Sequence, residues 1–299
     1  MKPKFILFYS LFFIVSSVVF AFLLFPGKEL AAYLSQVVKN QNFILIIDDV
    51  KPAIPFTLKF ENTKFLIGQN INQDLGQKIN EGTQIIPQSF EVFLDPVSIL
   101  KNKKQIKFQS NFSQGSIKGQ LLLNSFDPLS FSNGTAFLSG MKISDFRYKT
   151  DLADIIFNCE LNGEYRQSRA GGKDDFGNGS LLIQNFSAEM KNSFFNILNL
   201  PIVDFSNIKL EFIQQTNGLT ITKCLAMGSI INVKLKGRVD IAFPVQKTRL
   251  NLTGVILPDS PYLAKFANMA RIKSVVKNSK KEGIIFTIKG TLKNPEIKI

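Results

Sequence analysis

The sequence predicts a mainly β protein, in which an N-terminal transmembrane helix precedes an elongated, curled antiparallel sheet with two short amphipathic helices. Two observations predict this fold. An uncharged run of 21 residues lies near the start of the chain, and most later segments alternate apolar and polar side chains with a period of two. Such alternation is typical of antiparallel strands that are covered on one face only. Either the sheet packs on itself, or it stays open as a groove or an open barrel.

The uncharged run extends from Phe5 to Phe25 and follows Lys2 and Lys4. At about 1.5 Å per residue it is long enough for a hydrocarbon core of roughly 30 Å. A cleaved signal peptide has a shorter apolar region that ends at small residues, whereas this run ends in Phe25 followed by Pro-Gly. We therefore expect an uncleaved anchor that crosses one membrane once.

The anchor divides the chain into three predicted parts. Residues 1–4 form a cytoplasmic n-region, because positive flanks stay in the cytoplasm, and residues 5–25 form the membrane span. Residues 26–299 form a periplasmic β-rich domain, which no low-complexity linker divides.

Two segments have the apolar spacing of helices. Residues 28–40 place Leu30, Ala31 and Leu34 on one stripe, and residues 260–277 follow an N-terminal cap. The first helix has two interpretations, a cap packed on the domain or a helix embedded in the membrane interface.

The strand pattern begins at Phe43 and continues to the C-terminal end, with Gly, Asn, Asp and Pro turn signals between the runs. Its clearest examples supply the candidate lining of an apolar groove: Ile231, Val233, Leu235, Gly237, Ile284, Phe286, Ile288 and Gly290. Glycines in mid-strand, at Gly119, Gly237 and Gly290, predict bulges or bends. The alternative is that they make room for an acyl chain.

The segment from Gln167 to Gly179 is rich in glycine and charge, and it predicts a long, mobile hairpin loop. Its Asp174, Asp175 and Asn178 do not have the spacing of a calcium-binding loop, so a solvated turn is the better interpretation.

The composition argues against catalysis. The chain has no histidine, which excludes a Ser-His-Asp triad, a Cys-His pair and a histidine zinc site. Adjacent carboxylates, such as Asp48 and Asp49, point to opposite faces of a strand. Phosphate-binding loops and the G-x-S-x-G nucleophile motif are also absent. We expect a protein that is not an enzyme and has no cofactor or metal.

The net charge of +13 comes from basic residues scattered singly along the strands. This pattern favours a solvated surface, and the alternative is attraction to anionic lipid headgroups. Nucleic acid is not an expected partner outside the cytoplasm. Cys159 and Cys224 form a disulfide in an oxidising compartment or remain two buried thiols, and the sequence leaves both alternatives open.

The order of these pieces resembles the type II secretion system protein N (GspN) family and, more distantly, AsmA-like proteins. The resemblance lies in Phe25-Pro-Gly before an amphipathic helix, and in the segments 50–56, 90–100, 115–119, 249–254 and 288–298. It implies an inner-membrane accessory component of the general secretion pathway, a periplasmic interaction module whose partners are secretion-system proteins. The AsmA-like connection implies the alternative, a β-groove that binds phospholipid acyl chains.

Overall fold

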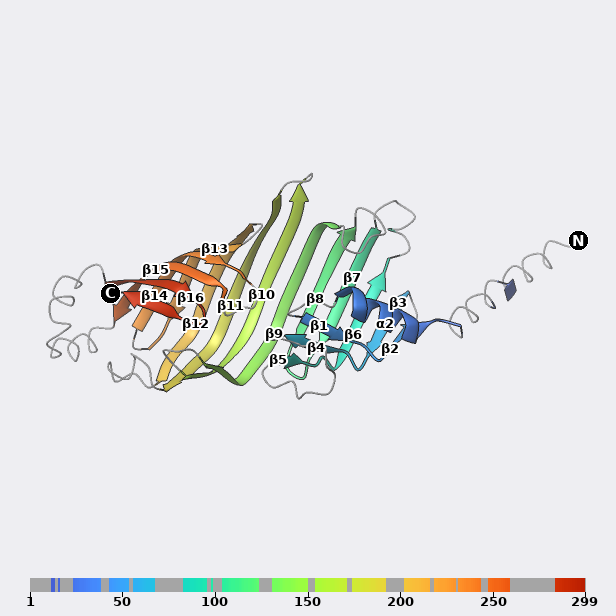
Figure 1. Ribbon diagram of the computed structural model, residues 1–299, viewed down its shortest axis with the longest axis horizontal. Coiled ribbons are helices and arrows are strands. Elements are labelled where there is room, and N and C mark those ends of the chain that lie inside the picture. Colours follow the sequence, from blue (N-terminus) through green and yellow to red (C-terminus); the bar gives the residue numbers. More distant parts are fainter. Residues whose placement is uncertain are drawn as a thin grey trace, which may run out of the picture. The chain divides into compact units, whose positions relative to one another are not determined.

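A computed structural model gives the architecture of the chain (Figure 1). It describes residues 12–13, 16, 24–38, 43–53, 56–67, 83–95, 98, 104–123, 131–149, 154–170, 174–191, 202–215, 218–229, 231–242, 247–258 and 283–298. The predicted mainly β, antiparallel class is confirmed. Strands form one sheet of 14 strands and one of three, and the chain divides into two compact units.

Unit 1 comprises residues 1–101 and 106–111. Its elements are helix α2 (Gly27–Val38) and strands β1 (Phe43–Ile46), β2 (Asp49–Ala53), β3 (Thr57–Glu61), β4 (Lys64–Ile67), β5 (Thr83–Ile85) and β6 (Ser89–Leu94), with most of β7 (Lys104–Asn111). The three-stranded sheet has the order β1-β4-β5, whereas β2, β3, β6 and β7 belong to the larger sheet.

The core of unit 1 forms where α2 contacts β1 and β2. Ala31 of the helix and Val50 of β2 are each only 1% exposed, and Phe90 packs against Phe60 with ring centroids 4.9 Å apart. Tyr33 is exposed on the other side of the helix. The structure therefore supports the first interpretation of this helix, a cap packed on the domain.

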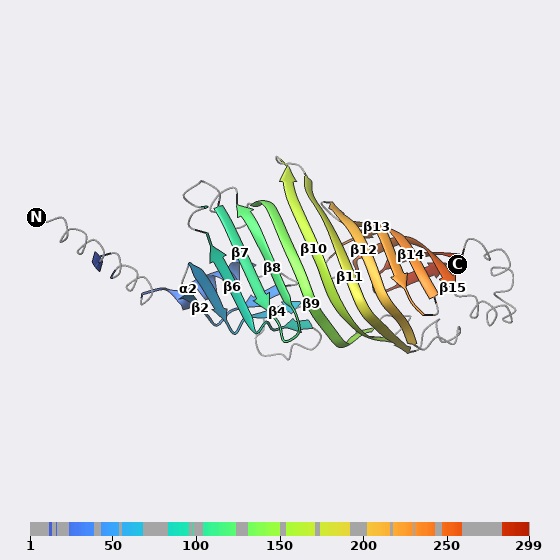
Figure 2. The same ribbon diagram turned by 180° about the vertical axis from the view of Figure 1, so that it is seen from behind.

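Unit 2 comprises residues 102–105 and 112–299. Its strands are β8 (Ser116–Leu123), β9 (Phe131–Lys149), β10 (Asp154–Ala170), β11 (Asp174–Lys191), β12 (Ile202–Gln215), β13 (Gly218–Met227), β14 (Ile231–Asp240), β15 (Arg249–Pro258), β16 (Ile284–Thr291) and β17 (Pro295–Lys298). Each of these strands pairs antiparallel with the next one along the chain, so the unit is a meander (Figure 2).

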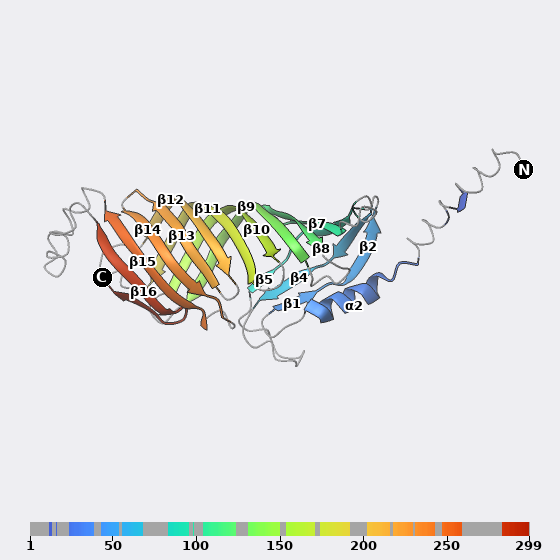
Figure 3. The ribbon, with the colours of Figure 1, turned by 90° about the horizontal axis from the view of Figure 1, so that it is seen from above.

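The sheet of unit 2 is curved but not closed (Figure 3). In the 14-stranded sheet the strand order is β17-β16-β15-β14-β13-β12-β11-β10-β9-β8-β7-β6-β3-β2, so β17 and β2 are its two edges. The structure therefore confirms an open antiparallel sheet, which is the coarser part of the predicted groove or open barrel. Its edge strand β17 has four residues and includes Pro295, Glu296 and Lys298, which are typical of an edge that resists further pairing.

The predicted transmembrane helix is contradicted, and with it the localisation as a single-pass inner-membrane protein. In the part of the chain that the structure describes, no helix is long and apolar enough to cross a membrane. The helix α2 has 12 residues, so its length is about 18 Å against a hydrocarbon core of roughly 30 Å, and Lys28 and Glu29 interrupt its apolar character.

Several predictions fall on residues outside the described set. These are Lys2, Lys4 and Phe5, most of the span up to Phe25, and the second amphipathic helix at 260–277.

The predicted loop from Gln167 to Gly179 is wrong. Residues up to Ala170 extend β10, residues from Asp174 extend β11, and the two strands stay paired to the register Ala170–Asp174. The glycines that suggested a loop, Gly177 and Gly179, lie inside β11. Because cross-strand pairing satisfies the backbone and neighbouring rings cover the glycines, local turn propensity does not decide the structure here.

Candidate functional site: the apolar face of unit 2

The candidate site is one face of the sheet in unit 2, and the cross-strand register builds it. Residues opposite each other in an antiparallel pair share a face. The register groups Val233 with Ile256 and Ile284, Leu235 with Gly254 and Phe286, and Gly237 with Leu252 and Ile288. Ile231 lies opposite Pro258, and Gly290 lies opposite Leu250. All eight predicted groove-lining residues therefore lie on one face, which we call the apolar face.

The same register carries the apolar face across the earlier strands. Leu235 pairs with Cys224, Cys224 with Leu210, and Leu210 with Leu181. Side chains on this face between β8 and β13 are almost all aliphatic, aromatic or small: Ile117, Leu121, Leu138, Met141, Ile143, Leu161, Leu181, Ile183, Ile208, Leu210, Phe212 and Ile221. In β17, Ile297 and Pro295 lie opposite Ile288 and Gly290, so the face is continuous over the ten strands β8–β17.

Charge is segregated to the other face of unit 2, which we call the polar face. Among the strand residues whose side chains the structure describes, no Asp, Glu, Lys or Arg lies on the apolar face. Strict alternation along each strand, with bulges where it is interrupted, produces this separation.

Most of the apolar face is half-buried. A local cluster between β11 and β15 is fully packed, with Val203, Phe205, Ala226 and Ile231 each below 10% exposed. Side chains such as Leu235 retain partial exposure. Among the described residues, unit 2 has no α-helix, so no described helix of this unit covers the face.

Glycines on the apolar face accommodate aromatic rings or unusual backbone. A Cβ at Gly254 would overlap the ring of Phe286, and a Cβ at Gly179 would overlap the ring of Phe212. The room at these glycines is therefore filled by rings of the neighbouring strands and is not open to a ligand. Gly237 has φ of 142° opposite a register shift in β13, which fits the predicted bulge.

One end of the apolar face carries polar groups. The Tyr165 hydroxyl donates a hydrogen bond to Oε1 of Gln214, and the Tyr165 ring stacks on Phe212 with centroids 6.3 Å apart. Gln167 lies in the same row of the register, opposite Gly177, which is opposite Gln214. The face is thus amphipathic along its strands, with amide groups at the end nearest the tip of the β10–β11 hairpin.

The two cysteines lie on the apolar face as free thiols. Cys159 belongs to β10 and Cys224 to β13, with β11 and β12 between them. Three strand spacings of about 4.8 Å exceed the Cα separation of a disulfide, which is at most about 7 Å. Burial raises the pKa of both thiols, so they favour the protonated form.

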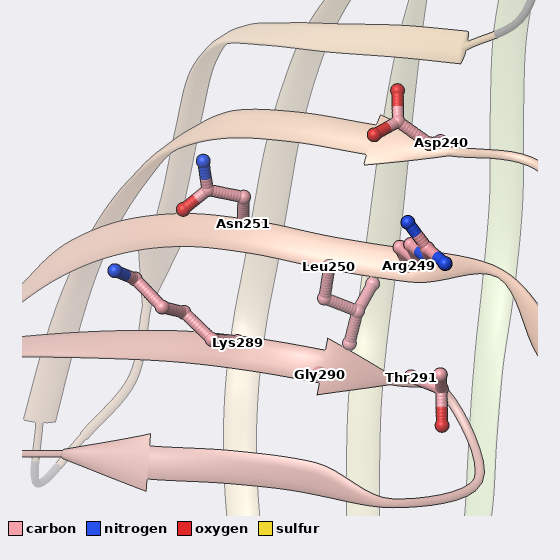
Figure 4. Close-up of a pocket in the computed structure, with 7 residues that line it drawn as sticks. All are labelled: Asp240, Arg249, Leu250, Asn251, Lys289, Gly290 and Thr291. Carbon is pink, nitrogen blue, oxygen red and sulfur yellow. The ribbon is translucent and has the colours of Figure 1, made fainter.

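Two hollows of the described surface lie on the polar face. One, of about 350 Å³, is lined by Asp240, Arg249, Leu250, Asn251, Lys289, Gly290 and Thr291 (Figure 4). The other, of about 270 Å³, lies over β10–β13, and its carboxylates are those of Glu164 and Glu211. Glu164 pairs with Arg166, and Glu211 pairs with Lys223. Because each carboxylate there has a basic partner, this second hollow has no free acid for catalysis.

Residues that could perform metal or acid–base chemistry are not brought together in the described part of the chain. No three His, Cys, Asp or Glu side chains there are grouped to hold a metal ion. Asp48 accepts a hydrogen bond from Asn62, and Asp49 accepts one from the backbone of Val50 at 2.8 Å, so this adjacent pair stabilises a strand start.

No family model, curated protein or solved structure matches the chain.

Proposed function

We propose that the chain is a non-enzymatic lipid-binding protein whose apolar face in unit 2 holds acyl chains. The observation that carries this proposal is the continuous face of ten strands on which no described side chain is charged. A soluble sheet normally covers such a face with helices or a second sheet. An aliphatic chain satisfies the same requirement, because it needs no hydrogen-bond partner.

Burial of an acyl chain of ordinary length offsets much of the free-energy cost of association. Removing one CH₂ group from water contributes about 0.8 kcal/mol. If half of each group is covered, 15 such groups would contribute roughly 6 kcal/mol, which is within the range of about 4–15 kcal/mol that association costs. Additional affinity requires a polar contact, and the amide groups of Gln167 and Gln214 lie at one end of the face. We therefore expect the lipid carboxyl or ester group at that end and the chain along the strands.

The test uses the full-length protein and a fluorescent fatty acid that is displaced by unlabelled lipid. Leu235→Asp places a charge on the apolar face and should weaken binding at least tenfold. Its matched control is Thr253→Asp, which places the same charge on the polar face of the adjacent strand. Leu235→Trp keeps the face apolar but adds bulk. Loss of binding in this variant therefore indicates a blocked site and not a protein unfolded by a buried charge. Unchanged affinity in both Leu235 variants, or equal loss in the control, would refute the proposal.

A second candidate function is the interaction module of the type II secretion pathway that the resemblance implies. The observation that favours it is the end of the β10–β11 hairpin, which extends beyond the last described pairs with β9 and β12. Phe176 is 45% exposed there, and a partner protein can bind a hairpin by adding a strand to it. Phe176→Ala should then reduce co-purification of secretion-system proteins without changing fatty-acid binding. If those proteins still co-purify with the variant, the end of the β10–β11 hairpin is not their binding site.

A further inference from the structure

Among the strands of unit 2, the excess positive charge is concentrated in β14–β17, at one end of the sheet. Strands β8–β13 contain nine basic residues (118, 142, 147, 149, 166, 169, 191, 209 and 223) and nine acidic ones (145, 154, 160, 164, 174, 175, 189, 204 and 211). Strands β14–β17 contain six basic residues (234, 236, 238, 249, 289 and 298) and only two acidic ones (240 and 296). In the sequence these bases are scattered singly, and the antiparallel register brings them to one face.

Several of these bases have no acidic partner. Asp240 lies opposite Arg249 in the register but binds Nε of Arg238 at 2.6 Å instead. Within the described residues, Arg249 and Lys289 make no ion pair, although Glu296 lies opposite Lys289 in β17. The charge of Arg249 and that of Lys289 are therefore available to a ligand.

Arg249 and Lys289 border the larger hollow of the polar face, which Figure 4 shows with its lining side chains. Asn251 of β15 lies opposite Lys289, and Thr291 of β16 lies opposite Arg249. The Thr291 hydroxyl oxygen accepts a hydrogen bond from the backbone of Asn294, so its own proton remains free to donate. Two cations, an amide and a hydroxyl line a hollow of about 350 Å³, which Asp240 also lines. Because Arg238 pairs with the Asp240 carboxylate, the remaining lining suits a phosphate group.

The same face presents aliphatic groups beside the cations and no aromatic ring. Ile285 is 58% exposed, the largest exposed fraction among the large apolar side chains of unit 2 that the structure describes. It lies opposite Val255, which lies opposite Lys234. Single-stranded nucleic acid is bound through aromatic stacking, which β14–β17 do not offer on this face. An exposed aliphatic side chain between basic residues suits the interface of a lipid bilayer instead.

We propose that the polar face of β14–β17 docks on an anionic phospholipid bilayer. Arg249 and Lys289 bind headgroup phosphate in the hollow, Lys234 and Lys236 contribute charge, and Ile285 inserts below the headgroups. The inference does not depend on the acyl-chain proposal, because it uses the opposite face of the sheet.

The test measures partitioning of the full-length protein into vesicles of pure phosphatidylcholine and vesicles with 30% phosphatidylglycerol. The ratio of the two partition coefficients cancels any apolar contribution that both vesicles share. The double variant Arg249→Gln/Lys289→Gln should lower this ratio about 30-fold, the change expected for two basic residues near the surface. Ile285→Ser should lower partitioning into both vesicles and leave the ratio unchanged.

The matched control is Lys118→Gln/Lys142→Gln, which removes the same charge from exposed positions of β8 and β9. It should lower the ratio less than threefold. Circular dichroism of each variant verifies that the sheet is intact, which is expected because all four side chains are exposed. An equal loss in the control would show attraction by net charge alone and overturn the site. An unchanged ratio in the Arg249/Lys289 variant, or displacement of the protein from vesicles by single-stranded RNA at equal phosphate concentration, would overturn it as well.

Discussion

Adjacent residues of β16 provide a sharp test of the two faces of unit 2. Phe286 lies on the apolar face with its ring over Gly254 and is 9% exposed, whereas Ile285 lies on the polar face and is 58% exposed. Buried Phe→Ala substitutions cost about 3–5 kcal/mol, and the half-open face places Phe286→Ala at the lower end, about 3 kcal/mol. Ile285 has about two fifths of its surface covered, so Ile285→Ala should cost roughly 1 kcal/mol.

The measurement is thermal unfolding followed by far-ultraviolet circular dichroism. For a unit of this size, each kcal/mol lowers Tm by about 2–4 °C, so Phe286→Ala should lower Tm by roughly 6–12 °C and Ile285→Ala by about 2–4 °C. Phe286→Leu retains most of the apolar volume, so its decrease in Tm should lie between those of Phe286→Ala and Ile285→Ala. If Ile285→Ala is as destabilising as Phe286→Ala, or more so, then the assignment of faces by register is refuted.

Three further predictions concern the backbone, the thiols and the core of unit 1. Gly237→Ala should cost about 1–3 kcal/mol, because φ of 142° is strained for alanine, and an unchanged Tm would argue against the bulge at this position. Cys159 and Cys224 should both be alkylated in denaturant without a reductant, as read by intact mass; protection of both would indicate a disulfide. In the folded protein their alkylation at pH 8 should be slower than that of glutathione, because burial raises both pKa values and leaves less thiolate. Ala31→Asp should cost about 3 kcal/mol or more through a buried, unpaired charge, and a loss below 1 kcal/mol in denaturant titration would contradict the packing of α2.

The sequence was sufficient to predict the class of sheet and the faces of its strands. Alternation of period two at Ile231, Val233 and Leu235 is a local property, and the register of β14–β16 preserves it. The loop at Gln167–Gly179 was predicted wrongly, because Gly177 and Gly179 have turn propensity but their neighbours across the sheet are Gln214 and Phe212. These neighbours are more than 30 positions away along the chain, and local sequence patterns do not identify contacts at that separation.

The basic end of the polar face also could not be found by reading along the chain. Lys236, Arg249 and Lys289 are separated by 13 to 53 positions, and only the register places them on one surface. A signal that could have found them is the ratio of basic to acidic residues in each predicted strand, which rises after residue 230. The transmembrane prediction depended on the length of one apolar run, and the helices that the structure describes do not include one of that length.

The most direct test of acyl-chain binding by the apolar face is photo-crosslinking of the full-length protein with a diazirine-labelled fatty acid, followed by peptide mass spectrometry. The account predicts adducts on the apolar-face residues of neighbouring strands, such as Leu210, Leu235 and Leu252, and none on Lys234, Lys236 or Thr253 between them. Adducts distributed equally over both faces, or confined to residues outside unit 2, would contradict it.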